Sequence, residues 1–213
     1  MFGKVMTVKS EDDIEILREN ALIVSRTLAE VGKNIKPGVS TLMLDRIAEE
    51  YIRSEGAVPG FKGYRGFPGT LCVSVNEEVV HGIPGERVLK NGDIVSIDCG
   101  CQKGGFYGDS AYTFPVGEVA PEVLKLLERT KESLFRAIDA AVAGKRVGDI
   151  GAAVQEYVEG FGYSVVRELV GHGIGHYLHE KPDVPNYGRK GSGPKLPAGL
   201  VICIEPMINL GVK

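Results

Sequence analysis

The sequence predicts an α+β fold built from two related halves. Helical patterns are followed by short strand-like runs, and this order of elements occurs twice along the 213 residues. Helices grouped before strands, rather than strictly alternating with them, favour a sheet in which neighbouring strands are antiparallel. The recurrence predicts two pseudo-symmetric helix-helix-strand halves around a curved, mostly antiparallel sheet, with the helices on one side.

The first half is expected over residues 10–118 and begins with two helices. Ser10 is a typical N-cap residue, acidic residues follow it, and apolar residues then recur at helical spacing as far as Leu28. Pro37-Gly38 ends this helix, and Ser40 opens a second one that runs toward Gly56. Strand-like apolar runs are then expected at 71–75, 94–99 and 112–116.

The second half is expected over residues 119–213 and repeats this order. A long amphipathic helix after Pro121 precedes a shorter helix between Gly144 and Gly162. A shift of 106 positions (144 − 38) places Gly38 on Gly144, and a shift of 107 (205 − 98) later places Asp98 on Glu205. Between these matches, His81-Gly82-Ile83-Pro84 recurs as His172-Gly173-Ile174-Gly175. Three matches in the same order indicate a duplicated unit, and ligand sites tend to form between such halves.

Composition and charge exclude several classes of function. The formal net charge is −3 and no basic block occurs, so direct nucleic-acid binding is not expected. No apolar stretch is long enough to cross a bilayer, and the N-terminus has no signal-peptide core, so the cytoplasm is the expected location. Four cysteines lie in or beside apolar runs and are expected to be reduced thiols in the core: Cys72, Cys99, Cys101 and Cys203.

Asp98 and Asp109 suggest a cation site. Asp98 ends one strand-like run, Asp109 begins the next, and Lys103-Gly104-Gly105 between them is a turn signal. If the turn centres between residues 103 and 104, the two aspartates face each other directly, with Cβ atoms about 5 Å apart. Two facing carboxylates repel each other, so the pair needs a shared proton or a metal ion.

The second half supplies two further ligand candidates. Glu205 follows the apolar run 200–204, where an unpaired charge would cost several kcal/mol. His172 lies between glycines, which leave its imidazole accessible. Each of these residue types, taken singly, is more often structural, but carboxylates together with one imidazole suit divalent Mn, Fe, Co or Zn.

These motifs, in this order, resemble the type I methionine aminopeptidases. The matching segments are Asn76–Pro84, Asp98 with Asp109, Gly171–Gly175, His179-Glu180 and Ile204-Glu205-Pro206-Met207. The resemblance implies the pita-bread fold, a single catalytic domain over residues 1–213, and hydrolysis of the first peptide bond assisted by two divalent metal ions. Its implied partners are the N-termini of nascent polypeptides, met free or at the ribosome, and the chain is expected to act as a monomer without a membrane.

The resemblance also implies a role for each site residue. The implied metal ligands are Asp98, Asp109, His172 and Glu205, and Glu205 would also pass a proton. The implied catalytic and substrate-binding histidines, which are not ligands, are His81 and His179. The methionine pocket would be lined by Phe61, Tyr64, Phe67, Cys72 and Leu178, although many members have a smaller residue at position 61.

The family uses a fifth ligand, a glutamate late in the sequence. The repeat likewise predicts a counterpart of Asp109 near position 216 (109 + 107) or later. The chain stops at Lys213, so it is expected to be a truncated chain with an incomplete second half.

Three alternatives remain open. A mononuclear zinc hydrolase would use His172, His176 and His179 on one helix face, but the intervening glycines disfavour that helix. A non-catalytic binding module, or a catalytically impaired fragment, could share the fold. A proline dipeptidase is a third choice, although those enzymes generally carry an extra N-terminal domain.

Overall fold

The computed structural model describes residues 6–211. Contacts within the chain group it into two units, one formed by Glu15–Ala120 and the other by Met1–Ile14 together with Pro121–Lys213. The boundary near residue 120 falls close to the expected division between the two halves. Among the described residues, no helix has the length and apolar character needed to cross a bilayer.

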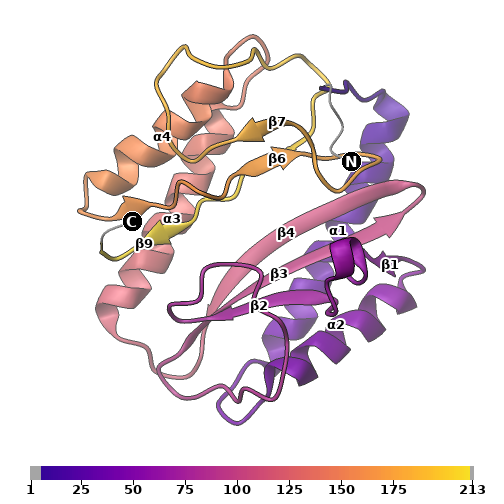
Figure 1. The fold of residues 1–213 in the computed structure, drawn as a ribbon, viewed down its shortest axis with the longest axis vertical. Helices are drawn as coiled ribbons and strands as arrows, with labels where there is room; N and C mark the ends of the chain where they lie inside the picture. Colours follow the sequence, from indigo (N-terminus) through magenta and orange to yellow (C-terminus); the bar gives the residue numbers. More distant parts are fainter. Residues whose placement is uncertain (1–5, 212–213) are drawn as a thin grey trace. The chain divides into compact units, whose positions relative to one another are not determined.

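The unit Glu15–Ala120 combines two helices with a four-stranded antiparallel sheet (Figure 1). The central strand β3 (Ile94–Lys103) pairs with β4 (Phe106–Pro115) along one edge, and with β1 (Val58–Pro59) and β2 (Leu71–Val75) along the other. The helices are α1 (Glu11–Asn34) and α2 (Thr41–Ser54), and a short 3-10 turn covers Tyr64–Gly66. The predicted helices and strands of this half are therefore confirmed.

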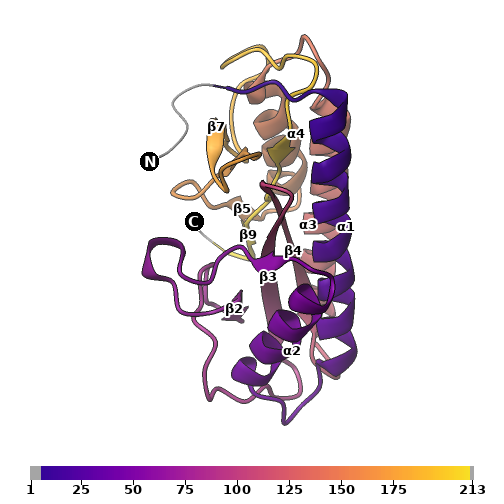
Figure 2. The same ribbon diagram turned by 90° about the vertical axis from the view of Figure 1, so that its right-hand side faces the viewer.

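The core of this unit lies between the two helices and one face of the sheet (Figure 2). Val95, Ile97 and Cys99 of β3 are fully buried, and so are Val24 of α1 and Leu44 of α2. Successive side chains of a strand point to opposite faces, so the even-numbered residues of β3 point away from this core. Ser96 and Asp98 are accordingly only half-buried. The sheet thus has one apolar face in the core and an opposite face that carries the half-buried polar side chains of Ser96 and Asp98.

The β3–β4 hairpin differs from the expected register. Its turn is Gly104-Gly105, with φ of 62° and 80°, so that Lys103 pairs with Phe106. A two-residue turn with positive φ at both positions favours consecutive glycines, whereas a turn centred one residue earlier would force Lys103 into that region. Asp98 therefore pairs with Ala111, and Asp109 pairs with Gly100. The prediction that Asp98 and Asp109 are directly opposed is wrong by two residues. The prediction that they share a face is confirmed, because a shift of two preserves the face.

The other unit contains the remaining elements. Its helices are α3 (Pro121–Ala140) and α4 (Val147–Glu159). A three-stranded antiparallel sheet has the order β7 (Glu180–Val184), β6 (Gly171–Gly173) and β8 (Ile202–Cys203), and β5 (Ser164–Val165) pairs with β9 (Ile208–Asn209). Within the expected apolar strand 200–204, residues 202–203 form β8, and Leu200 pairs with Val8 in an isolated bridge. Within residues 6–211 the strands thus form three sheets, all with antiparallel ladders.

The predicted repeat is visible in backbone hydrogen bonds. The Gly38 amide donates to the Leu89 carbonyl at 2.9 Å, and the Gly144 amide donates to the Leu196 carbonyl at 2.8 Å. Both glycines have positive φ, 93° and 89°, at equivalent points before the second helix of each half. The correspondence of the helix pairs is therefore confirmed by the structure.

The match between the two His-Gly-Ile segments is not reproduced in local structure. His172 lies within β6, whereas His81 has a φ of 55° in a loop that follows β2. The neighbouring Gly82 is pressed against β2, where an added Cβ would lie 2.1 Å from the Val73 carbonyl oxygen. The two histidines are thus placed by different backbone conformations, despite their similar sequence contexts.

Candidate metal centre

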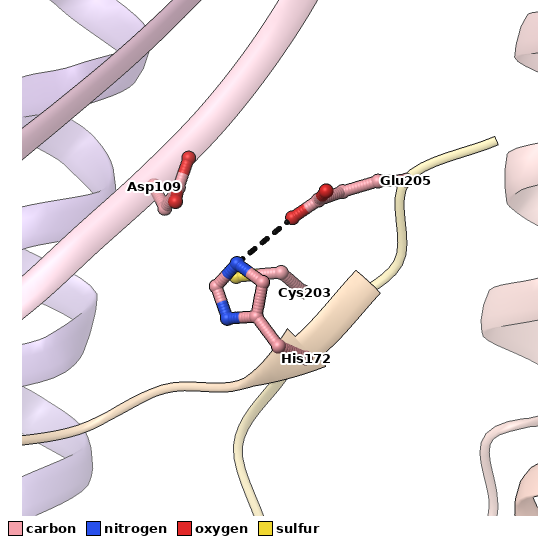
Figure 3. Close-up of side chains that lie close together, drawn as sticks. All are labelled: Asp109, His172, Cys203 and Glu205. Carbon is pink, nitrogen blue, oxygen red and sulfur yellow. Dashed lines mark ion pairs between the residues drawn. The ribbon is translucent and has the colours of Figure 1, made fainter. Parts of the chain in front are cut away.

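His172 and Glu205 meet on the three-stranded sheet. His172 of β6 pairs across the strands with Cys203 of β8, and Glu205 follows two residues later. The His172 Nε2 atom lies 3.2 Å from Glu205 Oε1, and the ligand atoms of His172, Cys203 and Glu205 all lie within 4.8 Å of one another. Figure 3 shows the imidazole directed at the Glu205 carboxylate, with the Cys203 sulfur beside it.

Glycines make this close approach possible. A Cβ on Gly171 would lie 2.3 Å from the Cys203 carbonyl oxygen, and one on Gly173 would lie 2.4 Å from the Lys181 carbonyl oxygen. The residues on either side of His172 therefore have to be glycine, because backbone atoms occupy the space that side chains would need. The glycines noted in the sequence act by admitting the neighbouring strands, rather than by leaving the imidazole open.

The hydrogen bonding of His172 leaves Nε2 as the ring nitrogen that can bind a cation. Its Nδ1 lies 2.9 Å from the Gly173 carbonyl oxygen, which can only accept, so Nδ1 carries a hydrogen and, in a neutral ring, the lone pair is on Nε2. The Nε2 lone pair then points toward a carboxylate oxygen, which is unfavourable unless a proton or a metal ion lies between them. Metal-binding histidines commonly donate their other N–H to a backbone carbonyl in this way. An imidazole with a carboxylate fits a divalent transition metal.

The unit Glu15–Ala120 has an acidic face of its own. Cys72 of β2 pairs directly with Asp98, and Asp109 lies on the same face of the sheet, two pairs farther along the β3–β4 ladder. Burial raises the pKa of the Cys72 thiol, and the negative charges of Asp98, Asp109 and Asp45 raise it further. The thiol is therefore neutral at physiological pH. Asp98 and Asp109 are half-buried, so a cation on this face would relieve their mutual repulsion.

The two histidines expected to act on substrate lie in different settings. The His179 ring lies beside the metal-ligand candidate His172, with ring centroids 4.3 Å apart, in the turn before β7. His81 is exposed in the loop after β2, and the adjacent Val80 also has positive φ, 37°. Non-glycine residues with positive φ are uncommon, and they often occur at functional loops.

The residues of the expected methionine pocket also divide between the units. Phe61 packs directly on Gly100, where an added Cβ would lie 2.4 Å from the Phe61 ring, on the face of β3 that carries Asp98. Cys72 lies on this face as well. Tyr64 and Phe67 are half-buried in the 3-10 turn region, and Leu178 is buried in the other unit.

The structure rejects the helix needed for a zinc site built from His172, His176 and His179. Residues 171–173 are a β-strand, and residues 175–179 form an irregular turn. His176 is exposed on this turn. Without a helix, the i, i+4, i+7 spacing of the three histidines does not place them on one face.

Cys203 is the candidate site residue that sequence reasoning missed. Cys72, Cys99 and Cys101 are buried, as expected, but Cys203 is only half-buried and lies beside His172 and Glu205. Alternation along a strand gives the available signal, because residues 203 and 205 are two apart and share a face. Its apolar neighbours in the sequence instead indicated a core position.

Comparison with known proteins identifies the family. The family model for metallopeptidase family M24 matches residues 15–212. The chain belongs to metallopeptidase family M24. This M24 member is 54% identical over 205 residues to methionine aminopeptidase 1 of Bacillus subtilis, covering 96% of this chain and 83% of that protein. It is 52% identical to the Clostridium acetobutylicum methionine aminopeptidase over 208 residues, covering 97% of this chain and 83% of that protein.

Solved structures agree with this assignment. The methionine aminopeptidase from Rickettsia prowazekii matches with a TM-score of 0.96 at 40% identity, covering 97% of this chain and 84% of that chain. A prolidase from Pyrococcus furiosus matches at 24% identity with a TM-score of 0.83, but this chain covers 58% of it, and that likeness shows the fold alone. The resemblance expected from the sequence and the pita-bread fold are thus confirmed, and membership of a metallopeptidase family implies divalent metal ions.

Proposed function

We propose that this M24 peptidase removes the N-terminal methionine from nascent polypeptides by hydrolysing the first peptide bond. Two divalent ions, from among Co, Mn, Fe and Zn, are held in this proposal by Asp98, Asp109, His172 and Glu205. The observation that carries the proposal is the His172–Glu205 cluster, whose 3.2 Å approach requires a proton or a metal ion between the two atoms, in a chain 54% identical to a methionine aminopeptidase.

When bound, the metal ions would supply an activated water and polarise the carbonyl group of the first peptide bond. His172 presents Nε2 to them, because its Nδ1 hydrogen is held by the Gly173 carbonyl. The Glu205 backbone is fixed by Asn186, whose side-chain amide donates to the Glu205 carbonyl at 2.6 Å. A carboxylate held in this way can accept a proton from water and return it to the leaving amine.

The remaining site residues bind and orient the substrate in this proposal. His81 and His179 would donate hydrogen bonds to the reacting peptide and stabilise the charge that develops in the transition state. Cys72 supports the methionine pocket because its thiol, kept neutral by its raised pKa, offers an uncharged and polarisable surface to a thioether. The pocket would be completed by Phe61, Tyr64, Phe67 and Leu178.

The chemistry of the site sets the partners of the proposed enzyme. Its substrates would be the free N-termini of newly made polypeptides. The enzyme would act as a monomer and meet these substrates in the cytoplasm and at the ribosome. An aminopeptidase must select its substrates by their first side chain and free amine. An X-Pro dipeptide, the kind of substrate that a prolidase cleaves, therefore serves as the competing substrate.

The test compares release of Met from Met-Ala-Ser with cleavage of an X-Pro dipeptide by the protein, with added Mn or Co. We expect Met-Ala-Ser to be the better substrate, and His172→Ala to lose metal and at least about a hundredfold in kcat/KM. Lys190→Ala, at an ammonium group with 67% exposure, is the matched control. Faster cleavage of X-Pro would overturn the substrate, and metal binding without any turnover would indicate a binding module.

A further inference from the structure

A buried ion pair packs against the turn formed by residues 175–179, which carries His179. Lys9 Nζ lies 2.6 Å from Glu180 Oε2, and the two side chains are only 4% and 5% exposed. Thr7 links them, since its hydroxyl accepts from Lys9 Nζ at 2.7 Å and donates to Glu180 Oε2. We call Thr7, Lys9 and Glu180 the N-terminal anchor.

The donors and acceptors of the anchor are fully matched. The three hydrogens of the Lys9 ammonium meet Thr7 Oγ1, the Thr7 carbonyl oxygen at 3.2 Å and Glu180 Oε2. The second carboxylate oxygen, Glu180 Oε1, accepts from the Tyr177 backbone amide at 3.2 Å. The anchor therefore does more than pair two charges, because it also binds the backbone of the turn.

The turn is packed against the anchor. An added Cβ on Gly175 would lie 2.4 Å from Lys9 Cε and 2.6 Å from Glu180 Oε1. The Gly175 amide also donates to the Tyr177 carbonyl at 3.2 Å, which folds the turn back on itself. Residues 175–180 thus pack against the Lys9 ammonium and the Glu180 carboxylate, which leave no room for a side chain at position 175.

The anchor connects this turn to backbone that is fixed independently. The Lys9 amide donates to the Gly199 carbonyl at 2.8 Å, and isolated bridges join Val8 to Leu200 and Met6 to Lys181. The chain around Lys9 would therefore keep its place if the Lys9 ammonium were removed. The turn would lose the Lys9 contact but would keep the Thr7 hydrogen bond to Glu180 and the bridge between Met6 and Lys181.

Stability alone does not account for a buried charge pair at this position. Apolar residues of similar volume commonly stabilise a protein as well as a buried ion pair or better, because burying charges costs solvation energy. Hydrogen bonds between charged groups do, however, impose distance and direction. His179 immediately precedes Glu180, and its ring lies 4.3 Å from that of His172.

We propose that the N-terminal anchor positions His179 beside His172, making Lys9 and Glu180 positioning residues for the reaction. The catalytic part of this inference rests on the proposed function, in which His179 contacts the substrate. The metal ligands His172 and Glu205 lie on β6 and after β8, outside the turn, so the anchor acts on His179 without forming the metal site.

The decisive variant is the double replacement Lys9→Met/Glu180→Leu, which removes both charges and leaves neither one buried alone. The matched control is Lys190→Met/Glu156→Gln, at a pair separated by 2.7 Å whose side chains are 67% and 61% exposed. Amide hydrogen exchange of residues 175–179 is measured in both. We expect at least tenfold faster exchange in the anchor variant, unchanged exchange in α4, the same metal content, and wild-type behaviour in the control.

Kinetics on Met-Ala-Ser then separate positioning from general support of the fold. We expect the anchor variant to lose at least tenfold in kcat with little change in KM, and to lose nothing further when His179→Ala is added. Unchanged exchange at 175–179, or kcat losses that multiply with that of His179→Ala, would overturn the proposal. Absence of turnover in the unmodified protein would instead defeat the proposed function, and the exchange measurement would still decide whether the anchor holds the turn.

Discussion

Asp45 joins α2 to the start of β2, and replacing it with alanine is expected to destabilise the protein by about 2–4 kcal/mol. Its Oδ1 atom accepts from the backbone amides of Thr70 and Leu71, at 2.7 and 2.8 Å, and Asp45 is only 6% exposed. Alanine would leave two buried amides without this acceptor, each at a cost of about 1–3 kcal/mol. Part of that cost is offset because burial raises the pKa of Asp45, which shows that the charged carboxylate is itself unfavourable there.

The control for this change is Asp45→Asn, which keeps an acceptor oxygen and removes the charge. We expect it to cost less than about 1 kcal/mol, since the two amide hydrogen bonds can persist. Urea unfolding followed by circular dichroism measures both variants, and the alanine variant should also melt about 4–16 °C lower, at about 2–4 °C per kcal/mol. Equal effects of Ala and Asn would refute the reasoning, because the acceptor oxygen would then contribute nothing.

Three further outcomes are expected. Gly151→Ala should destabilise the protein by about 1–3 kcal/mol, measured by thermal unfolding, because the new Cβ would lie 2.3 Å from the Tyr187 carbonyl oxygen. Alanine normally favours a helix over glycine, so a stabilised variant would contradict this prediction. Burial would raise the pKa of Glu180, but hydrogen bonds to its carboxylate outweigh that effect and lower it. Its contribution to stability should therefore be complete above about pH 4.5 and be lost as pH falls through the lowered pKa, a loss that Glu180→Gln should not show in acid unfolding. None of the four cysteines forms a disulfide, and Cys203 should react first with a thiol reagent at pH 8, since Cys72 and the others are buried. Bound metal should slow that reaction, and faster labelling of Cys72 would count against the site geometry.

Local signals explain why the helices could be predicted from sequence. Ser10 and Asp13 form the expected reciprocal cap, with the Ser10 amide donating to the Asp13 carboxylate at 2.9 Å and the Asp13 amide to the Ser10 hydroxyl at 3.2 Å. Ser40 likewise accepts from the Met43 amide at 3.2 Å. Such caps involve residues three apart, so they are encoded within a single turn of the chain.

The β3–β4 register was a local signal that sequence reasoning assigned incorrectly. Placing both Gly104 and Gly105 in the turn gives the observed pairing, because each of them needs positive φ. Including Lys103 in the turn shifted the partner of Asp98 from Ala111 to Asp109. The face assignment survived because side chains alternate with a period of two.

Other parts of the site depend on contacts between distant residues. Lys9 and Glu180 are 171 positions apart, and the sequence gives no spacing that pairs them. Cys203 reaches the site because β8 pairs with β6, a pairing in which His172 opposes Cys203. Its apolar sequence neighbours had favoured a core position. The duplicated pattern did predict Glu205 as a ligand candidate, because repeats convert a long-range relation into a constant shift.

The central proposal is that Asp98, Asp109, His172 and Glu205 hold two metal ions. Anomalous X-ray diffraction from crystals of the protein grown with Co or Mn tests it directly. The account predicts two anomalous peaks bounded by the side chains of Asp98, Asp109, His172 and Glu205. A metal-replete crystal in which these side chains point apart into solvent, with no anomalous peak between them, would contradict it.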